Sequence, residues 1–289
     1  MSLLKYLIVS SGKYIPRPIK VVLRNILPLS FYESLANKRV VIVSFPKCGR
    51  SWLRLMLSEM ICKSLGVNEV NDLETNLLWY EHPLIPHITV DHDDALWKTP
   101  DELDKDKSQY KGCKIIFLVR DPRDVVVSWY FQLTKRKSSE ETDKKINLDS
   151  ISKFIRSERS SLKTIINFYN IWLKNKGIVG DFLIVTYENL SSNPYEEIKK
   201  ILNFSGIEHI VSKTHALETI EENTFDKVRE KEKSKAIKHE AFKSFDLNDP
   251  ESFKARKGIV GGYREYFNQE DIDYINKEIK NNLNPEFGY

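Results

Sequence analysis

Residues 40–57 read VVIVSFPKCGRSWLRLML and join the pattern of a buried strand to that of an amphipathic helix through a short polar loop. The strand at 40–43 is entirely β-branched, which suits a buried position in a sheet. The loop carries Lys47, Gly49 and Ser51. A strand that turns through glycine into a helix presents unpaired backbone N–H groups and the positive end of the helix dipole. The stretch therefore predicts an anion site, and a phosphate-like group is its natural occupant.

Two further stretches follow the same plan of strand, polar loop and helix. They read KIIFLVRDPRDVVVSWYFQ at 114–132 and DFLIVTYENLSSNPYEEIKKILNF at 181–204, and apolar spacing predicts one or two amphipathic helices at 148–175. Near-continuous apolar strands that alternate with helices are typical of a parallel sheet covered on both faces. We expect an α/β fold, a single domain with a central parallel β-sheet flanked by helices. Its three loops should meet at the carboxyl ends of the strands.

The loop is not a Walker A motif, because the GxxxxGK[ST] spacing is absent and Lys47 precedes the glycine. A magnesium-dependent kinase places an aspartate near a strand end, but the strand at 114–119 ends at Arg120. A cation at that place repels a metal and attracts a second anion. Two adjacent cations and a glycine near the C-terminus suit a doubly charged phosphate: Arg256, Lys257 and Gly258. We therefore expect an anion bound at two separate points, with no metal.

Five short motifs, taken in order, resemble the sulfotransferase family that uses 3'-phosphoadenosine 5'-phosphosulfate (PAPS). FPKCGRSWL at 45–53 resembles that family's 5'-phosphosulfate loop, YPKSGTTW, and RDPRDVVVS at 120–128 resembles its 3'-phosphate motif, RNPKDxxVS. TYENL at 186–190 resembles YEDL, TF at 224–225 resembles SF, and RKGIVGGY at 256–263 resembles RKGxxGDW. The match runs from about residue 38 to 267, and several motifs in order are more specific than any one.

The resemblance implies a role for each matching position. PAPS would be the co-substrate, with Lys47 stabilising charge on the bridging oxygen and Trp52 stacking on the adenine. The 5'-phosphosulfate would be held by Lys47, Cys48, Gly49, Arg50, Ser51 and Trp52; the 3'-phosphate by Arg120, Ser128, Arg256, Lys257 and Gly258; and the adenine side by Tyr187, Thr224 and Phe225. A sulfuryl group in transfer carries less charge than a phosphoryl group, so donors and cations suffice without Mg²⁺.

The general base of the family lies in a KTH-like segment between its first two nucleotide motifs. In YEHPLIPHITVDHDDALW, at 80–97, His92 matches best, because HITVD precedes it where the family has a strand. Histidine suits this role near neutral pH. Weaker candidates are His82 and His87, and three aspartates are expected to orient His92 or to replace it: Asp91, Asp93 and Asp94.

The chain departs from the family pattern at several positions. Cys48 and Arg50 replace a serine and a threonine, and Val90 stands where the family has a lysine two residues before the base. One transition-state cation is therefore missing or comes from elsewhere, and Lys98 is a candidate. Gly262 and Tyr263 replace Asp and Trp in the last motif, and the family's KxxxTVxxxE dimerisation motif is not recognisable, so the oligomeric state stays open.

Three other functions compete with this reading. Cys48 and Arg54 fit the CX5R signature of cysteine-dependent phosphatases, in which a helix N-terminus activates the thiolate. Trp52 and Leu53 would, however, put bulky groups in a loop that must wrap phosphate, and the histidine that precedes the signature is absent. The second is a magnesium-dependent kinase, and the third is a noncatalytic nucleotide-binding protein.

Composition sets wider limits. The chain has 289 residues, a net charge of +4 that is too balanced to favour nucleic acid, and three cysteines in an odd, widely spaced set. Without a secretory h-region, these cysteines predict a reduced, cytoplasmic protein. Residues 1–32 are basic and apolar, which suits either a peripheral contact with an anionic membrane or an arm over the core, and residues 33–289 form the expected domain.

The acceptor is not readable from any motif. We expect its pocket to come from the variable loops at 66–100, 133–150 and 205–250. We expect a hydroxyl or amine acceptor that is a small molecule, a carbohydrate or a lipid, and the basic N-terminal segment favours a carbohydrate or lipid-linked one. The stretches at 135–147 and 227–240 are highly charged, and the second is expected to form a solvated helix or a lid.

Overall fold

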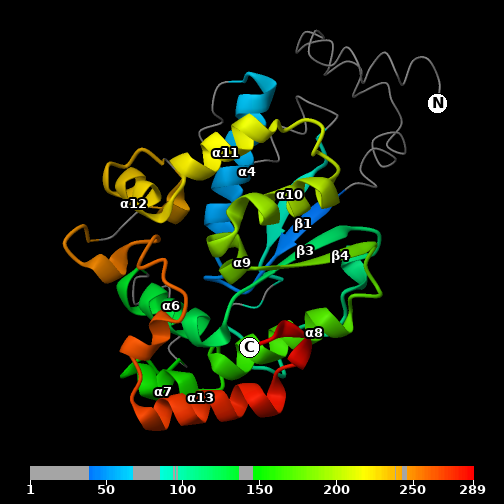
Figure 1. The fold of residues 1–289 in the computed structure, drawn as a ribbon. Coiled ribbons are helices and arrows are strands. Elements are labelled where there is room, and N and C mark those ends of the chain that lie inside the picture. The colour runs from blue at the N-terminus through cyan, green and yellow to red at the C-terminus, as the bar shows by residue number, and fades with distance from the viewer. Residues whose placement is uncertain are drawn as a thin grey trace.

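The fold is a four-stranded parallel sheet with helices on both faces (Figure 1). The computed structural model describes residues 39–67, 85–93, 95, 97–136, 146–237, 239–242 and 246–289. The strand order is β2-β1-β3-β4 and every pairing is parallel. The strands are β1 (Val40–Val43), β2 (Ile88–Asp91), β3 (Lys114–Val119) and β4 (Asp181–Thr186). The predicted α/β fold with a central parallel sheet is confirmed.

The helices form a layer on each face of the sheet (Figure 1). One layer contains α4 (Arg50–Leu65), α9 (Tyr187–Ser192), α10 (Pro194–Ser205) and α11 (Lys213–Glu222), and α12 (Phe225–Lys233) continues from α11. The other contains α6 (Pro122–Lys135), α7 (Ile151–Arg156), α8 (Leu162–Lys174) and α13 (Gln269–Asn282). Short 3-10 turns lie at Ser108–Tyr110, Glu240–Phe242, Pro250–Ser252, Gly262–Glu265 and Pro285–Phe287.

The starts of α6 and α4, the helices that follow β3 and β1, are capped differently. At α6 the Asp121 side chain accepts from the Arg123 amide and Pro122 occupies the first turn, so this start is well capped. At α4 the N-cap is Gly49, with φ of 94°, and no side chain among the described residues caps the helix. The first backbone N–H groups of α4 are therefore open to a ligand.

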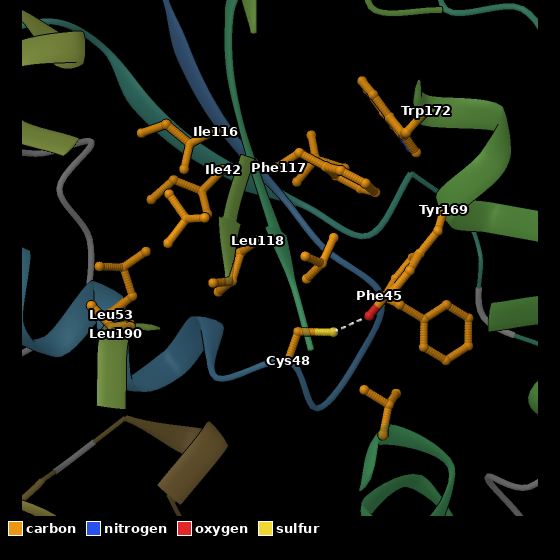
Figure 2. Packing of buried hydrophobic residues seen from close by; sticks show 14 of the residues in the cluster. Ile42, Phe45, Cys48, Leu53, Ile116, Phe117, Leu118, Tyr169, Trp172 and Leu190 are labelled. Carbon is orange, nitrogen blue, oxygen red and sulfur yellow. Dashed lines mark hydrogen bonds between the residues drawn. The ribbon is translucent and has the colours of Figure 1, made fainter. Parts of the chain in front are cut away.

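The core packs the sheet against α8 through aromatic rings (Figure 2). Phe117 of β3 is fully buried, and its ring centroid lies 5.9 Å from that of Trp172 and 5.7 Å from that of Tyr169. The region at 148–175, predicted to form one or two helices, forms α7 and α8. This packing fixes the carboxyl ends of β1 and β3, where the polar loops begin.

Some predictions fall on residues outside the described ranges. They concern the N-terminal segment at 1–32, most of the charged stretch at 135–147, and the candidate side chains His82 and Asp94. The stretch at 227–240 begins in α12, a helix with a largely polar surface, as expected for a solvated helix. In the described part of the chain, no helix is long and apolar enough to cross a membrane.

Candidate active site

A cavity of about 560 Å³ lies at the carboxyl ends of the four strands. At least one lining residue follows each strand: Lys47 follows β1, His92 follows β2, Arg120 follows β3 and Tyr187 follows β4. The predicted site residues that line it are Lys47, Gly49, Arg50, Ser51, Trp52, His92, Arg120, Ser128, Tyr187, Thr224, Phe225, Arg256, Lys257 and Gly258. The expected convergence of the loops is confirmed by this geometry, although the role of each residue stays a prediction.

Cys48 is the one predicted site residue whose side chain does not line the cavity. It is fully buried beneath the loop, and its sulfur lies 3.3 Å from the Tyr169 hydroxyl (Figure 2). The Tyr169 O–H donates to the Arg120 carbonyl, so the Cys48 S–H is the donor to the tyrosine oxygen. Burial raises the pKa of Cys48 to about 12. The thiol is therefore a packed, protonated group, which argues against a phosphatase nucleophile.

The charge of the cavity wall has one sign. Among the described residues that line it, none is an aspartate or a glutamate, and seven are lysines or arginines: Lys47, Arg50, Arg54, Arg120, Lys254, Arg256 and Lys257. An ordinary surface mixes positive and negative side chains. A cluster of positive side chains in a cavity instead raises the local electrostatic potential, which favours binding of a polyanion. A kinase site that holds Mg²⁺ needs acidic ligands, and this wall offers none among those residues.

Lys47 sits at the turn of the loop in the left-handed region, with φ of 74°. A non-glycine residue in this region is strained, and such strain is concentrated at ligand clamps. Its Nζ donates to Gln132 Oε1 of α6 at 3.0 Å. Desolvation, and then repulsion from Lys254, Arg136 and Arg256, lowers the pKa of Lys47 well below its ordinary value. A bound anion would relieve this repulsion.

His92 is held as a neutral imidazole with its Nε2 toward the cavity. Its Nδ1 lies 2.9 Å from the Ser44 carbonyl, which can only accept, so Nδ1 carries the proton and Nε2 has the lone pair. Desolvation, followed by repulsion from Arg50, lowers the pKa of His92 to about 3. The partner expected from the sequence was an aspartate, but Asp91 instead accepts from Tyr110, and Asp93 pairs with Lys107 at 2.6 Å.

The Arg50 guanidinium contacts the ring nitrogen of His92 that carries the lone pair. Its Nη2 lies 2.5 Å from His92 Nε2, and its Nη1 is buried with no hydrogen-bond partner. Desolvation, and then repulsion from Arg54, lowers the pKa of Arg50 to about 10. The guanidinium therefore lies between the candidate base and the phosphate-type loop, at a place where the family's threonine has no charge.

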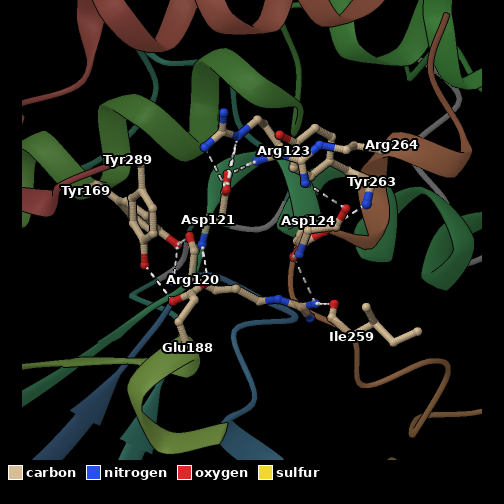
Figure 3. A network of polar contacts seen from close by, with 11 residues as sticks. Arg120, Asp121, Arg123, Asp124, Tyr169, Glu188, Ile259, Tyr263, Arg264 and Tyr289 are labelled. Carbon is tan, nitrogen blue, oxygen red and sulfur yellow. Dashed lines mark hydrogen bonds and ion pairs between the residues drawn. The ribbon is translucent and has the colours of Figure 1, made fainter. Parts of the chain in front are cut away.

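Arg120 is fixed by a network that joins α6, α9 and the C-terminal part of the chain (Figure 3). Its Nη2 donates to the Ile259 carbonyl at 3.2 Å and lies 3.4 Å from Asp124, and its guanidinium lies 4.2 Å from the Tyr187 ring centroid. Asp124 accepts in turn from the amides of Gly261 and Tyr263. The network holds the loop that follows β3 against the 256–263 segment, so both halves of the predicted 3'-phosphate site are positioned together.

The segment at 252–258 contributes residues 254–258 to the cavity wall and is anchored by Glu232 of α12. This buried carboxylate accepts from the amides of Lys254 and Ala255, at 2.6 and 2.9 Å, and pairs with Arg136 at 3.2 Å. Gly258 then adopts φ of 68°, and a Cβ at this position would overlap the Phe225 ring. We call residues 252–258 the strap.

The predicted adenine side is an aromatic wall. Trp52 Nε1 donates to the Asn223 carbonyl at 2.7 Å, and its ring centroid lies 6.0 Å from that of Tyr187. A Cβ at Gly49 would approach Tyr187 Cδ2 to 2.7 Å, so only glycine fits beneath this ring. Thr224 and Phe225 complete the wall at the start of α12.

Sequence reasoning missed two lining residues that bear on chemistry. Gln132 lies one turn after Ser128 on α6 and holds Lys47, and the i, i+4 spacing was a signal for it. Lys254 lies two residues before Arg256, and the sequence motif predicts only its neighbouring cations, Arg256 and Lys257, as phosphate ligands. Desolvation, and then repulsion from Arg136 and Arg50, lowers the pKa of Lys254 to about 8.

Three other residues do not line the cavity. Arg123 pairs with Asp121 at 2.8 Å and faces α13 through Asn276. His87 precedes β2 and lies at the opposite end of that strand from His92. Lys98, the candidate replacement for the missing lysine, is not part of the cavity wall, whereas Arg50 and Lys254 are.

Known proteins are similar to this chain over most of its length. The sulfotransferase domain model matches residues 37–285. Flavonol 3-sulfotransferase of Flaveria bidentis is 24% identical over 263 residues, covering 84% of this chain and 81% of the relative. The 3-beta-hydroxysteroid sulfotransferase of Cavia porcellus is also 24% identical, covering 84% and 83%.

Two solved structures share the fold. Mouse sulfotransferase SULT7A1, complexed with PAP, has a TM-score of 0.59 at 18% identity and covers 85% of this chain and 84% of its own. Retinol dehydratase in complex with androsterone and inactive cofactor PAP has a TM-score of 0.57 at 17% identity, covering 85% and 80%. The family predicted from the five motifs is thus confirmed, and the chain belongs to the sulfotransferase family.

Proposed function

We propose that the chain transfers the sulfuryl group of PAPS to a hydroxyl of a small molecule, with His92 as the general base. The observation that carries this proposal is the cavity wall, which seven cations and the open N-terminus of α4 line, while none of the lining residues that the structure describes is acidic. Such a wall suits a donor with two separate anionic groups. The chain's family membership supplies the reaction class.

The donor would bind across the cavity with its phosphosulfate on the loop after β1. Lys47, the α4 amides and Ser51 would hold the 5' end, and Trp52, Tyr187 and Phe225 would enclose the adenine. The remaining phosphate contacts of the predicted site would come from Arg120, Ser128, Arg256, Lys257 and Gly258. The C-terminal cluster is already arranged for this, because Arg256 is held by Glu251 at 2.7 Å and Lys257 by Glu265 at 2.5 Å.

The reaction would proceed by in-line displacement at sulfur. The acceptor oxygen forms a bond to sulfur while the bond from sulfur to the bridging 5'-phosphate oxygen breaks, which leaves 3'-phosphoadenosine 5'-phosphate (PAP). His92 Nε2 takes the hydroxyl proton, and Lys47 stabilises the charge that develops on the bridging oxygen. Because Nε2 contacts Arg50 without substrate, the acceptor hydroxyl must displace that guanidinium before proton transfer.

The acceptor pocket would lie on the His92 side of the cavity. The expected loop at 205–250 contributes Ile220, Val228, His239, Ala241 and Phe242 to the lining, so the cavity wall is partly apolar. Two relatives are named for a flavonol and a 3-beta-hydroxysteroid, both hydroxyl compounds. The preference for a carbohydrate or lipid-linked acceptor rests on the segment at 1–32 and stays a prediction, as do its membrane contact and the cytoplasmic location.

The test is transfer of labelled sulfate from PAPS to a panel of flavonols, steroids, phenols and sugars, in excess EDTA. We expect label in an acceptor and stoichiometric PAP, with His92→Ala lowering turnover by roughly 100 to 10,000-fold. His87→Ala is the matched control, because this histidine lies outside the cavity, and it should keep most of the activity. Tight PAP binding without transfer to any acceptor would favour the noncatalytic alternative, and full activity of His92→Ala would exclude this base.

A further inference from the structure

The backbone at Arg120 and Asp121, just after β3, is held by side chains that do not line the cavity (Figure 3). The Arg120 N–H donates to the Tyr169 hydroxyl at 3.0 Å, and this hydroxyl donates in turn to the Arg120 carbonyl at 2.9 Å. The Asp121 N–H donates to Glu188 Oε1 at 2.9 Å. Tyr169 of α8 and Glu188 of α9 therefore fix the backbone from which the Arg120 side chain reaches the cavity.

Residues 285–289 contact both of these side chains. The Phe287 ring is buried, and its centroid lies 5.3 Å from that of Tyr169. The Tyr289 O–H donates to Glu188 Oε2 at 2.9 Å, so the two oxygens of this carboxylate join the loop after β3 to the segment at 285–289. Burial, and then the charge of Glu188, raises the pKa of Tyr289, so its hydroxyl keeps the proton that this bond requires.

The chain that leads to this segment is anchored to α8. The Asn170 side chain donates to the Asn282 carbonyl at 2.6 Å and accepts from the Asn284 amide at 2.9 Å. Lys176, two residues after α8, pairs with Glu286 at 2.9 Å. These contacts fix the path of the segment toward α9.

We propose that Tyr289 is a positioning residue for the 3'-phosphate site, because its bond to Glu188 steadies the loop from which Arg120 reaches the phosphate. This inference rests on the proposed function, in which Arg120 is a ligand of that phosphate. A carboxylate with a donor on each oxygen is held in one orientation, and loss of one donor lets it turn. Glu188 would then hold the Asp121 amide less firmly. The sulfotransferase domain model matches residues 37–285, so Tyr289 lies outside the matched part.

Binding of PAP and AMP to Tyr289→Phe tests this role. The substitution removes one oxygen and keeps the ring that packs against the core. We expect the Kd of PAP to rise by about three- to tenfold, because part of the effect of a hydrogen bond to a charged group is passed on to Arg120. The Kd of AMP, which lacks the 3'-phosphate, should stay unchanged. A purely structural role would instead lower Tm and leave the ratio of the two Kd values as it was.

A double-mutant cycle tests whether the effect passes through the carboxylate. In a Glu188→Ala background the bond is already absent, so Tyr289→Phe should change the ratio of the two Kd values no further. The matched control is Tyr274→Phe, which removes the same atom from a tyrosine of α13 whose ring lies on Arg156. It should leave both Kd values unchanged.

Two results would overturn the inference. One is a Tyr289→Phe variant with the same ratio of AMP to PAP Kd values as the unaltered protein, whatever its Tm. The other is a cycle in which the effects of Tyr289→Phe and Glu188→Ala on this ratio simply add. If the unaltered protein shows no preference for PAP over AMP, the proposed function itself is overturned, and this inference with it.

Discussion

At the scale of single residues, the contact between Arg50 and His92 decides the chemistry of the base. The Ser44 carbonyl fixes the proton on Nδ1, and Arg50 keeps a positive charge against Nε2. Both burial and this charge disfavour the imidazolium, so His92 is a neutral base well below neutral pH. The cost is that the lone pair is occupied until substrate arrives.

The pH dependence of turnover should report this contact. Because the pKa of His92 is lowered to about 3, kcat/KM should show no acid limb near pH 6.5, the ordinary histidine value. Arg50→Gln removes a cation that opposes protonation, so the pKa of His92 should rise and the acid limb should move to higher pH. Arg264→Gln, an exposed arginine, is the control. An acid limb at pH 6.5 in the unaltered protein would contradict this account. So would an Arg50→Gln variant whose acid limb does not move to higher pH.

Cys48 should be dispensable for chemistry. A serine hydroxyl can donate to the Tyr169 oxygen as the thiol does, so Cys48→Ser should keep most of the sulfotransferase activity. The buried thiol, with its raised pKa, should also resist iodoacetamide in the folded protein. Activity of the variant and mass spectrometry of the alkylated protein check both points. Complete loss of activity in Cys48→Ser would restore the phosphatase alternative.

At the scale of elements, the strap depends on α12 through one carboxylate. Glu232→Gln places an amide where three donors meet, so at least one of Arg136 and the two strap amides loses its acceptor. Breaking a buried ion pair in this way costs about 3 to 5 kcal/mol in the free energy of unfolding. The affinity for PAP should fall as well, because the strap carries Arg256 and Gly258.

Thermal unfolding and PAP titration of the variant measure these two effects. Glu230→Gln is the matched control, since Glu230 pairs with Lys233 on the exposed side of the same helix. It should change both quantities little, because exposed pairs contribute about 0 to 1 kcal/mol. Equal PAP affinity in Glu232→Gln and Glu230→Gln would show that the strap needs no anchor.

The strands, the loops and most of the site could be predicted from the sequence because their signals are local. Apolar runs next to glycine and proline predict strand, loop and helix, and parallel topology then brings Lys47, His92 and Arg120 to one edge. Contacts between side chains from different loops have no such signal. The Ser44 carbonyl as partner of His92, the reach of Arg50 and the position of Lys254 all depend on packing that the sequence pattern does not encode.

At the scale of the whole molecule, the cations that line the cavity repel one another, and a bound anion would reduce this repulsion. Lys47 and Lys254 both have lowered pKa values, so the folded state holds their charges less readily than the unfolded chain does. The unfolded chain therefore binds the lysine protons first as the pH falls, so the free energy of unfolding decreases from the ordinary lysine range down to about pH 8. Below that pH, the destabilisation due to Lys254 stays at its full value. A polyanion should therefore stabilise the protein strongly at neutral pH.

We expect PAP at 100 times its Kd to raise the free energy of unfolding by about 2.7 kcal/mol. For a chain of this size, this corresponds to a rise in Tm of about 5 to 10 °C. AMP at the same concentration, which lacks the 3'-phosphate, should have a much smaller effect. Scanning fluorimetry in EDTA measures the shift, and equal shifts with PAP and AMP would contradict a site built for two anionic groups.

The central claim is that the cavity holds a nucleotide by two anionic ends without a metal. The most direct measurement is isothermal titration with PAP, AMP and ATP in EDTA, on the unaltered protein, Arg256→Ala and the exposed control Arg264→Ala. The account predicts micromolar affinity for PAP alone, lost in Arg256→Ala and kept in Arg264→Ala. Equal affinity for PAP and AMP, or binding of ATP that requires Mg²⁺, would contradict it.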